Sequence, residues 1–339
     1  MNKNQIHRLK ELLNQSQNIV IVPHRNPDGD AMGSALAMFH FLKLKGHKAL
    51  VIAPNDYPDF LKWLPGNESV LQFESDPENC SSYIAEANLI FTLDFNDLSR
   101  TGAEMNKVLE QSVGIKIMID HHQEPGNYAE FMYSDTEISS TCEMVYNFFG
   151  FLGAIHLINT SIATCLYTGI MTDTGSFRFP STTSRTHQIA GDLMNKGANH
   201  AEIYNKVFDT NSLDRMHLLS CALRNLKVME EYNTAYISLS QQELDTFKFK
   251  KGDTEGFVNY GLSIKGIIMA VIFIENTQEE MIKISFRSKG SFSVNEFARA
   301  HFQGGGHTNA AGGRSELSLK ESVEKFISIL PQYKQQLAP

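Results

Sequence analysis

The first half of the chain alternates short apolar runs with longer runs whose apolar residues have helical spacing. The strand-like runs are 18–22, 49–53, 88–93 and 115–119, and the helix-like runs are 31–45, 102–111 and 140–149. Apolar residues recurring every three or four positions are typical of an amphipathic helix, and a short continuous apolar run is typical of a buried strand. The alternation predicts a doubly wound, mainly parallel α/β sheet. In such a sheet the functional site lies beyond the carboxyl ends of the strands.

The pattern changes after about residue 175. Helices are predicted at 183–195 and 201–208, a polar stretch follows at 209–213, and strands are predicted at 234–239, 266–274 and 281–287. Ser318 and Glu321 have the spacing of a capping box and predict the start of a final helix. A chain of 339 residues accommodates two domains of ordinary size. We predict a first domain at 1–195, a linker at 196–214 and a smaller α/β domain at 215–339.

Carboxylates and histidines follow the predicted strands of the first domain. They are His24, Asp28 and Asp30 after the first strand, Asp94 after the third, Asp120, His121 and His122 after the fourth, and Asp173 after a helix-like run. Each has an ordinary interpretation: Asp30 could cap the helix starting at 31, Asp28 could belong to a turn, and adjacent histidines occur by chance. The combination favours a functional site, because parallel strands bring their carboxyl ends to one edge of the sheet.

This concentration of acidic groups indicates a metal site. Carboxylates crowded at one edge repel one another strongly unless cations are bound. A mixed set of oxygen and imidazole ligands suits Mn²⁺, with Mg²⁺, Co²⁺ and Zn²⁺ as competitors. Two ions at one site need a shared ligand, and a carboxylate between the loops could bridge them.

A glycine-rich run in the second domain is a candidate anion site. It consists of Gly304, Gly305, Gly306 and His307, with Asn309 two residues further along. Consecutive glycines allow positive φ and close backbone approach, so their N–H groups could surround an anion, with His307 and Asn309 as further donors. The alternative is a flexible turn between two elements. Arg287 and, from the first domain, Arg100 could bind a phosphate, although an exposed arginine is usually a solvated surface charge.

Composition limits the partners and the compartment. The chain has 30 Lys and Arg against 38 Asp and Glu, a formal net charge of −8, which argues against coating nucleic acid by bulk charge. A small basic site or bound cations stay compatible with this balance. The 4 cysteines include no Cys-x-x-Cys pair, and the N-terminus has no apolar leader. We expect a cytoplasmic protein without a membrane partner, and a homodimer is compatible with the sequence.

Together these motifs resemble those of DHH phosphoesterases that carry a DHH-associated C-terminal domain. The similar features are His24-x-x-x-Asp28-x-Asp30, Asp94 with Arg100, Asp120-His121-His122, Asp173-Thr-Gly175-Ser-Phe-Arg178 and Gly304-Gly-Gly-His307. They extend over nearly the whole chain. Within the family, the short two-domain form most resembles the bifunctional oligoribonuclease and 3′-phosphoadenosine-5′-phosphate (pAp) phosphatase, or NrnA-like, branch. The resemblance implies an N-terminal metal-binding domain, a substrate-binding C-terminal domain and an active site in the cleft between them.

The resemblance also implies roles for individual residues. One Mn²⁺ would be held by His24, Asp28 and Asp94, and the second by Asp30, Asp94, His121 and Asp173, so that Asp94 bridges. Asp120 would orient a histidine and His122 would face the substrate phosphate. Arg287 and His307, with the glycine loop, would bind the phosphate or the terminal nucleotide. The chain departs from the family at Phe95-Asn96-Asp97, where small residues are frequent, and this departure could change the pocket wall near the metals.

The predicted activity is manganese-dependent hydrolysis of phosphoric esters by two-metal-activated water. The expected substrates are short oligoribonucleotides (nanoRNA), which an exonuclease would shorten, and pAp, acted on by the same site. An exopolyphosphatase, or a phosphodiesterase for linear or cyclic dinucleotides, would use the same chemistry on another substrate. A non-catalytic nucleotide-binding protein with a metal-stabilised fold is a further alternative, and its ligand set would be incomplete.

Overall fold

The chain forms two compact units in the computed structural model, which describes residues 1–277 and 280–338. The units are Met1–Thr210 and Asn211–Pro339. The segment 196–214, predicted as a linker, contains α8 (His200–Phe208) and the first two residues of α9 (Leu213–Asn225). Within the described part of the chain, no helix is both long and apolar enough to cross a bilayer.

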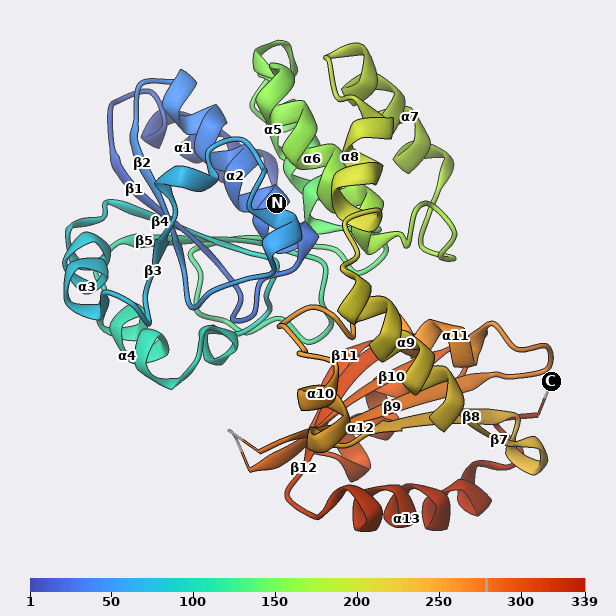
Figure 1. Ribbon diagram of the computed structural model, residues 1–339. Helices are drawn as coiled ribbons and strands as arrows, with labels where there is room; N and C mark the ends of the chain where they lie inside the picture. Colours follow the sequence, from blue (N-terminus) through green and yellow to red (C-terminus); the bar gives the residue numbers. More distant parts are fainter. Residues whose placement is uncertain (278–279, 339) are drawn as a thin grey trace. The chain divides into compact units, whose positions relative to one another are not determined.

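The first unit is built on a six-stranded sheet with the order β3-β2-β1-β4-β5-β6 (Figure 1). Its strands are β1 (Asn18–Pro23), β2 (Lys48–Ala53), β3 (Leu71–Gln72), β4 (Leu89–Leu93), β5 (Ile115–Asp120) and β6 (Phe131–Ser134). All neighbouring strands of this sheet pair in parallel. From β1 the chain proceeds outward to β2 and β3 and then returns to β4 on the other side of β1. The strand order therefore reverses between β1 and β4, which is where open α/β sheets bind their ligands.

Helices cover both faces of this sheet, so the predicted doubly wound α/β fold is confirmed. One face carries α1 (Lys3–Leu12), α2 (Gly29–Leu44), α5 (Thr141–Phe151), α6 (Thr160–Asp173), α7 (Ser184–Asn195) and α8, and the other carries α3 (Pro77–Glu86) and α4 (Ala103–Gln111). Short 3₁₀ turns are η1 (Asp59–Leu61), η2 (Asn67–Ser69), η3 (Leu98–Thr101) and η4 (Ile155–Leu157). Alternation along β1 shows the two faces, because Ile19 and Ile21 enter one core and Val20 and Val22 enter the other.

The second unit is built on a mixed sheet with the order β11-β12-β10-β9-β8-β7. Its strands are β7 (Lys227–Met229), β8 (Thr234–Leu239), β9 (Met269–Asn276), β10 (Met281–Ser288), β11 (Gly305–His307) and β12 (Ala310–Ser315). Its helices are α9, α10 (Gln241–Thr246), α11 (Phe257–Leu262), α12 (Val294–His301) and α13 (Leu319–Ile329), with 3₁₀ turns η5 (Glu230–Tyr232) and η6 (Leu330–Tyr333). β8 and β9 pair in parallel and the other pairs are antiparallel.

Each face of the second sheet also has a helical cover, which confirms the smaller α/β domain. Phe286 and Ile284 pack in one core with residues of α12 and α13, whereas Ile237 and Ile272 pack in another with α9, α10 and α11. The strand predicted at 266–274 begins later than expected, at Met269. Gly266 has a φ of +84°, so the chain is still in a turn at that point.

Candidate functional site

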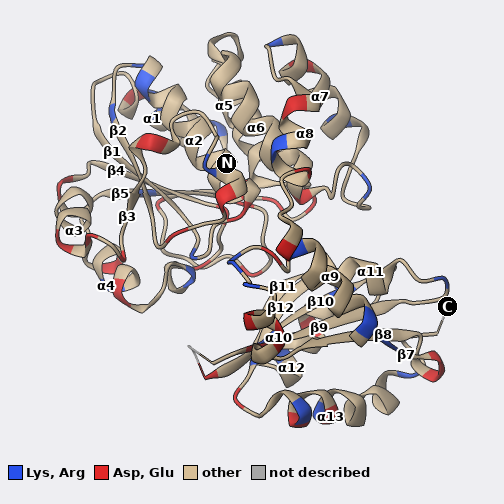
Figure 2. Ribbon diagram, in the orientation of Figure 1, with Lys and Arg blue, Asp and Glu red and all other residues tan. Residues whose placement is uncertain are grey.

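The loops that follow β1, β4 and β5 place their acidic and histidine side chains at one edge of the parallel sheet. Acidic residues are visible in these loops in Figure 2. His24 follows β1, Asp94 follows β4, and Asp120 ends β5. In the first unit three groups of potential metal ligands result: His24 with Asp28 and Asp94, Asp30 with Asp94 and His121, and Asp94 with Asp120 and His122. Asp94 belongs to all three, and the first two groups share it as two ion sites share a bridging ligand.

In the first group, His24 faces two carboxylates. Its Nε2 atom lies 3.8 Å from Asp28 Oδ2 and 3.5 Å from Asp94 Oδ2. The ring is fixed in this direction because Nδ1 contacts the backbone oxygen of Arg25 at 2.8 Å. A histidine that donates one ring N–H to a carbonyl presents its other nitrogen as a metal ligand.

The two carboxylate oxygens of Asp28 make different contacts. Oδ1 accepts hydrogen bonds from the backbone N–H groups of Asp30 and Ala31 at 3.0 and 3.1 Å, so Asp28 is the N-cap of α2. Oδ2 is the oxygen that faces His24. The interpretation of Asp30 as the cap of this helix is therefore wrong, since Asp30 lies inside the first turn.

In the second group, His121 faces three carboxylates. Its Nε2 atom lies 3.8 Å from Asp30 Oδ2, 3.5 Å from Asp94 Oδ1 and 3.4 Å from Asp173 Oδ2. Nδ1 lies 3.1 Å from the backbone oxygen of Ile138, which orients the ring as Arg25 orients His24. Asp173 is the last residue of α6 and is distant in sequence from both Asp30 and His121.

The spacing of these atoms fits a shared cation better than direct hydrogen bonds. These N···O separations are all longer than an ordinary hydrogen bond. Two atoms that bind one ion at about 2.1 Å lie about 3.0 Å apart in an octahedron and about 3.4 Å apart in a tetrahedron. The donor set of carboxylate oxygens and imidazole nitrogens is also the set that divalent transition metals prefer. The residues present therefore fit two divalent cations.

The pKa shifts of the clustered carboxylates also indicate a cation-binding site. Burial and the neighbouring carboxylates of Asp94 and Asp173 raise the pKa of Asp30 well above its usual value. Burial also raises the pKa of Asp173, to about 7, although its side chain is 27% exposed. Burial acts to raise the pKa of Asp94, but the imidazoles of His121 and His24 outweigh it and hold that pKa well below its usual value. Positive charge is thus favoured at this edge, as bound cations would supply it.

The start of α5 holds two of these carboxylates, a contact that the sequence did not reveal. The backbone N–H groups of Thr141 and Cys142 donate to Asp30 at 2.6 and 2.8 Å, and Thr141 Oγ1 donates to Asp94 Oδ1 at 2.9 Å. A helix N-terminus stabilises an anion through such N–H groups. The spacing of Ser140 and Glu143 predicts this helix start, and Ser140 does cap it by accepting from Glu143 N. Nothing in the spacing indicates that the next two residues meet Asp30.

Asp94 adopts a backbone conformation that few residues tolerate. Its φ is +67°, in the left-handed region, and its N–H donates to the backbone oxygen of Ile119 at 3.1 Å. Aspartate and asparagine enter this region more readily than most residues with a Cβ. Such a conformation persists when the surroundings hold it, and it is concentrated at functional sites.

Asp120 and His122 form a buried pair beside the two ligand groups. Asp120 is fully buried, and its Oδ1 lies 2.7 Å from His122 Nδ1. Among the described residues, its other oxygen, Oδ2, has no hydrogen-bond partner. The carboxylate therefore fixes the orientation of the His122 ring, which is the geometry of a carboxylate–histidine pair.

Glycines bring α6 close enough to α2 to place Asp173 next to Asp30. A Cβ added at Gly169 would lie 2.2 Å from Cys142 Sγ and 2.8 Å from Asp30 Oδ1. Added at Gly33, it would lie 2.6 Å from the backbone oxygen of Cys165. These contacts are shorter than van der Waals distances, so the two helices approach along faces without side chains.

Gly169→Ala should therefore damage the second ligand group while leaving the sheet intact. The methyl group must displace Cys142 or Asp30, and overpacking of this kind costs about 1–3 kcal/mol. We expect a lower melting temperature and, in calorimetric titrations, weaker binding of a divalent cation by the second ligand group. Gly191→Ala is the matched control, because a Cβ at Gly191, on α7, meets no atom within 4 Å. Equal effects of the two substitutions would contradict this account.

The departure at Phe95-Asn96-Asp97 does not alter the site as expected. Phe95 is fully buried in the core beneath α3 and α4, where its ring stacks on Tyr128. Asn96 donates to the backbone oxygen of Gln123 at 2.7 Å and so holds the loop that follows His122. The large side chain supports the core and does not form a pocket wall.

Arg100 lies in η3, where its charge reaches the first ligand group. Its backbone oxygen accepts a hydrogen bond from Arg25 N at 2.8 Å. The pKa of His24 is raised overall: burial acts to lower it, the carboxylates of Asp94 and Asp28 outweigh burial, and Arg100 opposes them. Arg100 is thus a cation beside the candidate metal centre.

In the second unit, strand register aligns the other two predicted phosphate-binding side chains. Arg287 on β10 pairs with Ala310 on β12, and Ala310 pairs with His307 on β11. Residues directly opposite each other in an antiparallel pair extend from the same face. Arg287 and His307 are two strands apart in this row, or about 10 Å, with the small Ala310 between them.

Two glycines of the run, Gly305 and Gly306, lie in the edge strand β11, and Gly304 precedes it. Gly304 N donates to the backbone oxygen of Ala298 and Gly306 N donates to Asn295 Oδ1, so both N–H groups are used internally. A Cβ at Gly304 would lie 2.0 Å from the Gly312 oxygen, and one at Gly306 2.5 Å from the Ala310 oxygen. These glycines are required for close pairing with β12.

Asn309 holds the turn after β11. Its side-chain Nδ2 donates to Ser288 Oγ at 2.9 Å and to the backbone oxygen of Gly290 at 3.0 Å. Both N–H groups of the amide are directed at these acceptors.

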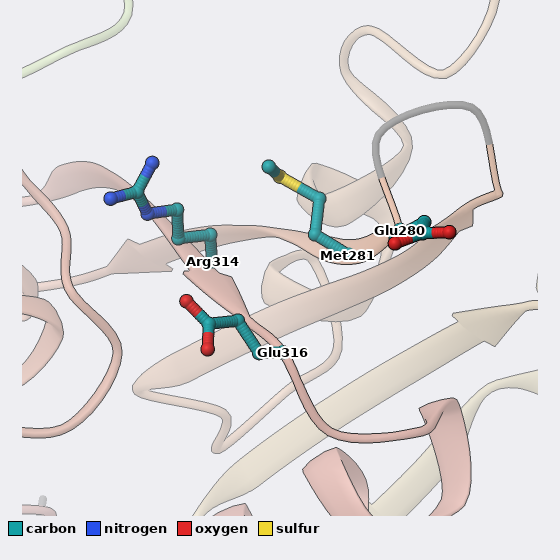
Figure 3. A pocket seen from close by; sticks show the side chains of 4 residues that line it. All are labelled: Glu280, Met281, Arg314 and Glu316. Atoms are coloured by element: carbon teal, nitrogen blue, oxygen red, sulfur yellow. The ribbon is translucent and has the colours of Figure 1, made fainter.

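An open hollow lies at the other end of β10 and β12. It has a volume of about 460 Å³ and is lined by Glu280, Met281, Arg314 and Glu316 (Figure 3). Two acidic side chains accompany its single arginine, and Arg314 donates to Gln303 Oε1 at 3.1 Å. The hollow therefore does not have the charge of an anion site.

Comparisons with known proteins give the family. The profile of the DHH family N-terminal domain matches residues 18–170, and that of the DHHA1 domain matches residues 233–336. The protein is 30% identical to the bifunctional oligoribonuclease and PAP phosphatase NrnA of Thermus thermophilus, over 91% of this chain and 88% of that protein. It is 29% identical to the protein of the same name from Bacillus subtilis, over 87% of this chain and 88% of that protein.

A solved structure agrees over nearly the whole chain. The crystal structure of an exopolyphosphatase-related protein from Bacteroides fragilis is 42% identical, has a TM-score of 0.94, and is matched over 99% of this chain and 98% of that chain. Its fold and the two domain profiles agree with the two units described above. The chain therefore belongs to the DHH family and is a phosphoric ester hydrolase with a C-terminal DHHA1 domain.

Proposed function

We propose that this chain is a manganese-dependent phosphoesterase that hydrolyses short oligoribonucleotides, pAp or both, with two bound ions. Residues 1–195 would hold the metal ions and residues 215–339 would bind the substrate, with 196–214 between them. The observation that carries the proposal is the sharing of Asp94 between two ligand groups, each with its own histidine. The choice of substrate is supported by the names of the relatives from Bacillus subtilis and Thermus thermophilus.

The proposed ligands follow from the two groups. His24, Asp28 and Asp94 would hold one ion, and Asp30, Asp94, His121 and Asp173 the other. Bound there, divalent cations would polarise a phosphoryl oxygen and lower the pKa of water. The chain's own contribution is to fix the ligand directions, through Arg25 and Ile138 for the histidines and through α5 for the carboxylates.

His122 would act on the substrate next to the ions. The Asp120 carboxylate accepts a hydrogen bond from its Nδ1 atom and so fixes the direction of Nε2. The ring can then donate a hydrogen bond from Nε2 to a phosphate oxygen, or supply a proton to the leaving oxygen. Arg100 would add positive charge for the same phosphate.

The second unit would bind a phosphate or the terminal nucleotide. Arg287 and His307 form one row across β10, β12 and β11, and the small residue between them leaves room for a flat or anionic group. Arginine meets a phosphate with two parallel hydrogen bonds, which gives both affinity and orientation.

Arg287→Ala should therefore weaken substrate binding more than turnover. A hydrogen bond to a charged group contributes about 1.5–3 kcal/mol, so KM should rise roughly 10- to 100-fold with a smaller change in kcat. Steady-state kinetics on pAp and on a dinucleotide measure both constants. Arg314→Ala is the control, since Arg314 has the same charge in the same sheet and lies in the hollow of Figure 3. Unchanged KM in Arg287→Ala would remove this residue from the site.

A panel of substrates with Mn²⁺ tests the proposed activity. It would compare pAp, a labelled series from di- to pentaribonucleotide, linear and cyclic dinucleotides, and polyphosphate. We expect phosphate release from pAp, mononucleotide release from the short RNAs, or both. Release of phosphate from polyphosphate, with no reaction of pAp or short RNA, would contradict the substrate assignment.

Exopolyphosphatase activity is the second candidate. It is favoured by the description of the Bacteroides fragilis structure as exopolyphosphatase-related. The same ligand groups could serve it, because polyphosphate hydrolysis also transfers a phosphoryl group to water. The polyphosphate arm of the panel decides between the two substrates.

A further inference from the structure

An asparagine from a neighbouring strand holds the loop that carries His24 and Asp28. Asn55 lies just beyond β2, and its side chain is 5% exposed. Its Oδ1 accepts a hydrogen bond from the backbone N–H of Asn26 at 2.7 Å, and its Nδ2 donates to Asn26 Oδ1 at 2.8 Å. The two residues thus form a reciprocal amide pair between the loops after β1 and β2.

Asn26 needs this support because of its backbone conformation. Its φ is +55°, in the left-handed region that is unfavourable for residues with a Cβ. Pro27 follows directly and further restricts the conformations open to Asn26. Since Asn26 lies between His24 and Asp28, a change in its backbone would alter the separation of the two proposed ligands.

Other contacts among the described residues anchor the flanks of the loop. Arg25 N donates to the backbone oxygen of Arg100 at 2.8 Å, and the Arg25 guanidinium pairs with Glu74. On the other flank, Asp28 caps α2. The pair with Asn55 engages both the backbone N–H and the side-chain oxygen of the central residue.

We propose that Asn55 is a positioning residue for the metal ion held by His24, Asp28 and Asp94. This inference depends on the proposed two-ion function. The ligands of the second ion are fixed elsewhere, Asp30 by the start of α5 and His121 by Ile138, so they do not depend on Asn55. Outer partners of metal ligands typically contribute 10- to 100-fold in metal affinity.

Mn²⁺ titration of metal-free Asn55→Ala tests the inference without reference to activity. We expect two ions in the wild-type chain. In the variant we expect one ion with wild-type affinity and a second bound roughly 10- to 100-fold more weakly. Electron paramagnetic resonance with two equivalents of Mn²⁺ per chain gives a second readout. The wild-type spectrum should be that of a coupled pair of ions, and the spectrum of Asn55→Ala should be that of an isolated bound ion. The melting temperature of the metal-free protein reports any general loss of structure.

Asn67→Ala is the matched control. Asn67 also makes a side-chain hydrogen bond in this part of the unit, accepting from Tyr57 Oη at 2.6 Å. It does not pair with the 24–28 loop, so both ions should bind as in the wild type.

Two results for Asn55→Ala would overturn the proposal. One is the binding of both ions with wild-type affinity. The other is equal weakening of both ions together with a lower melting temperature, which would show a general structural role. A wild-type chain that binds fewer than two ions would instead contradict the proposed function itself.

Discussion

Asp94→Asn should abolish hydrolysis and the binding of two metal ions. The carboxylate belongs to both ligand groups, with Oδ2 facing His24 and Oδ1 facing His121. An amide has one oxygen and no charge, so it cannot bridge two cations. We expect kcat/KM to fall by roughly 10³-fold or more, equivalent to about 4 kcal/mol of transition-state stabilisation. Kinetics and Mn²⁺ titration measure the two effects separately.

The substitution should leave the fold intact. Asparagine tolerates the left-handed φ of +67° at this position as aspartate does. Its oxygen can still accept the hydrogen bond from Thr141 Oγ1. Asp97→Asn is the control, because Asp97 is exposed and caps η3 through Ser99 N, a role that asparagine also performs. Wild-type turnover in Asp94→Asn would rule out the two-ion scheme.

Asp120→Asn should slow the chemical step while metal binding persists. Asp120 fixes His122 through a 2.7 Å contact to Nδ1 and lies outside the two proposed ligand sets. An amide can present its N–H to Nδ1, which reverses the tautomer that the carboxylate fixes in the ring. In a serine protease triad the corresponding change costs about 10⁴-fold in kcat, and we expect a loss of about 10²- to 10⁴-fold here.

The controls are two further measurements on Asp120→Asn and a second variant. Mn²⁺ stoichiometry and KM should stay close to the wild-type values. Asp135→Asn, in the loop after β6, should behave as wild type, because asparagine can keep the hydrogen bond that the Asp135 side chain accepts from Glu137 N. Wild-type kcat in Asp120→Asn, or an equal loss in Asp135→Asn, would contradict the role given to the pair.

Much of the first unit follows from local sequence patterns. The four predicted strands of its sheet each differ from the observed ones by a single residue, because buried parallel strands are short apolar runs bounded by turn residues. Strands β3 and β6 carry little pattern, with two and four residues respectively. The convergence of His24, Asp94 and His121 follows from the parallel arrangement alone.

The details of the site depend on contacts between distant segments. Thr141 and Cys142 meet Asp30 across more than a hundred residues, and helical spacing carries no information about that contact. The Asn26–Asn55 pair is hidden for the same reason. The sequence also did not reveal that the glycine run pairs with β12, because glycine permits both an anion nest and close strand pairing.

Anomalous diffraction from crystals grown with Mn²⁺ tests the central claim most directly. We predict two peaks in the first unit, one among His24, Asp28 and Asp94 and the other among Asp30, Asp94, His121 and Asp173, with Asp94 contacting both. A single peak, or two peaks that share no contact with Asp94, would contradict the account.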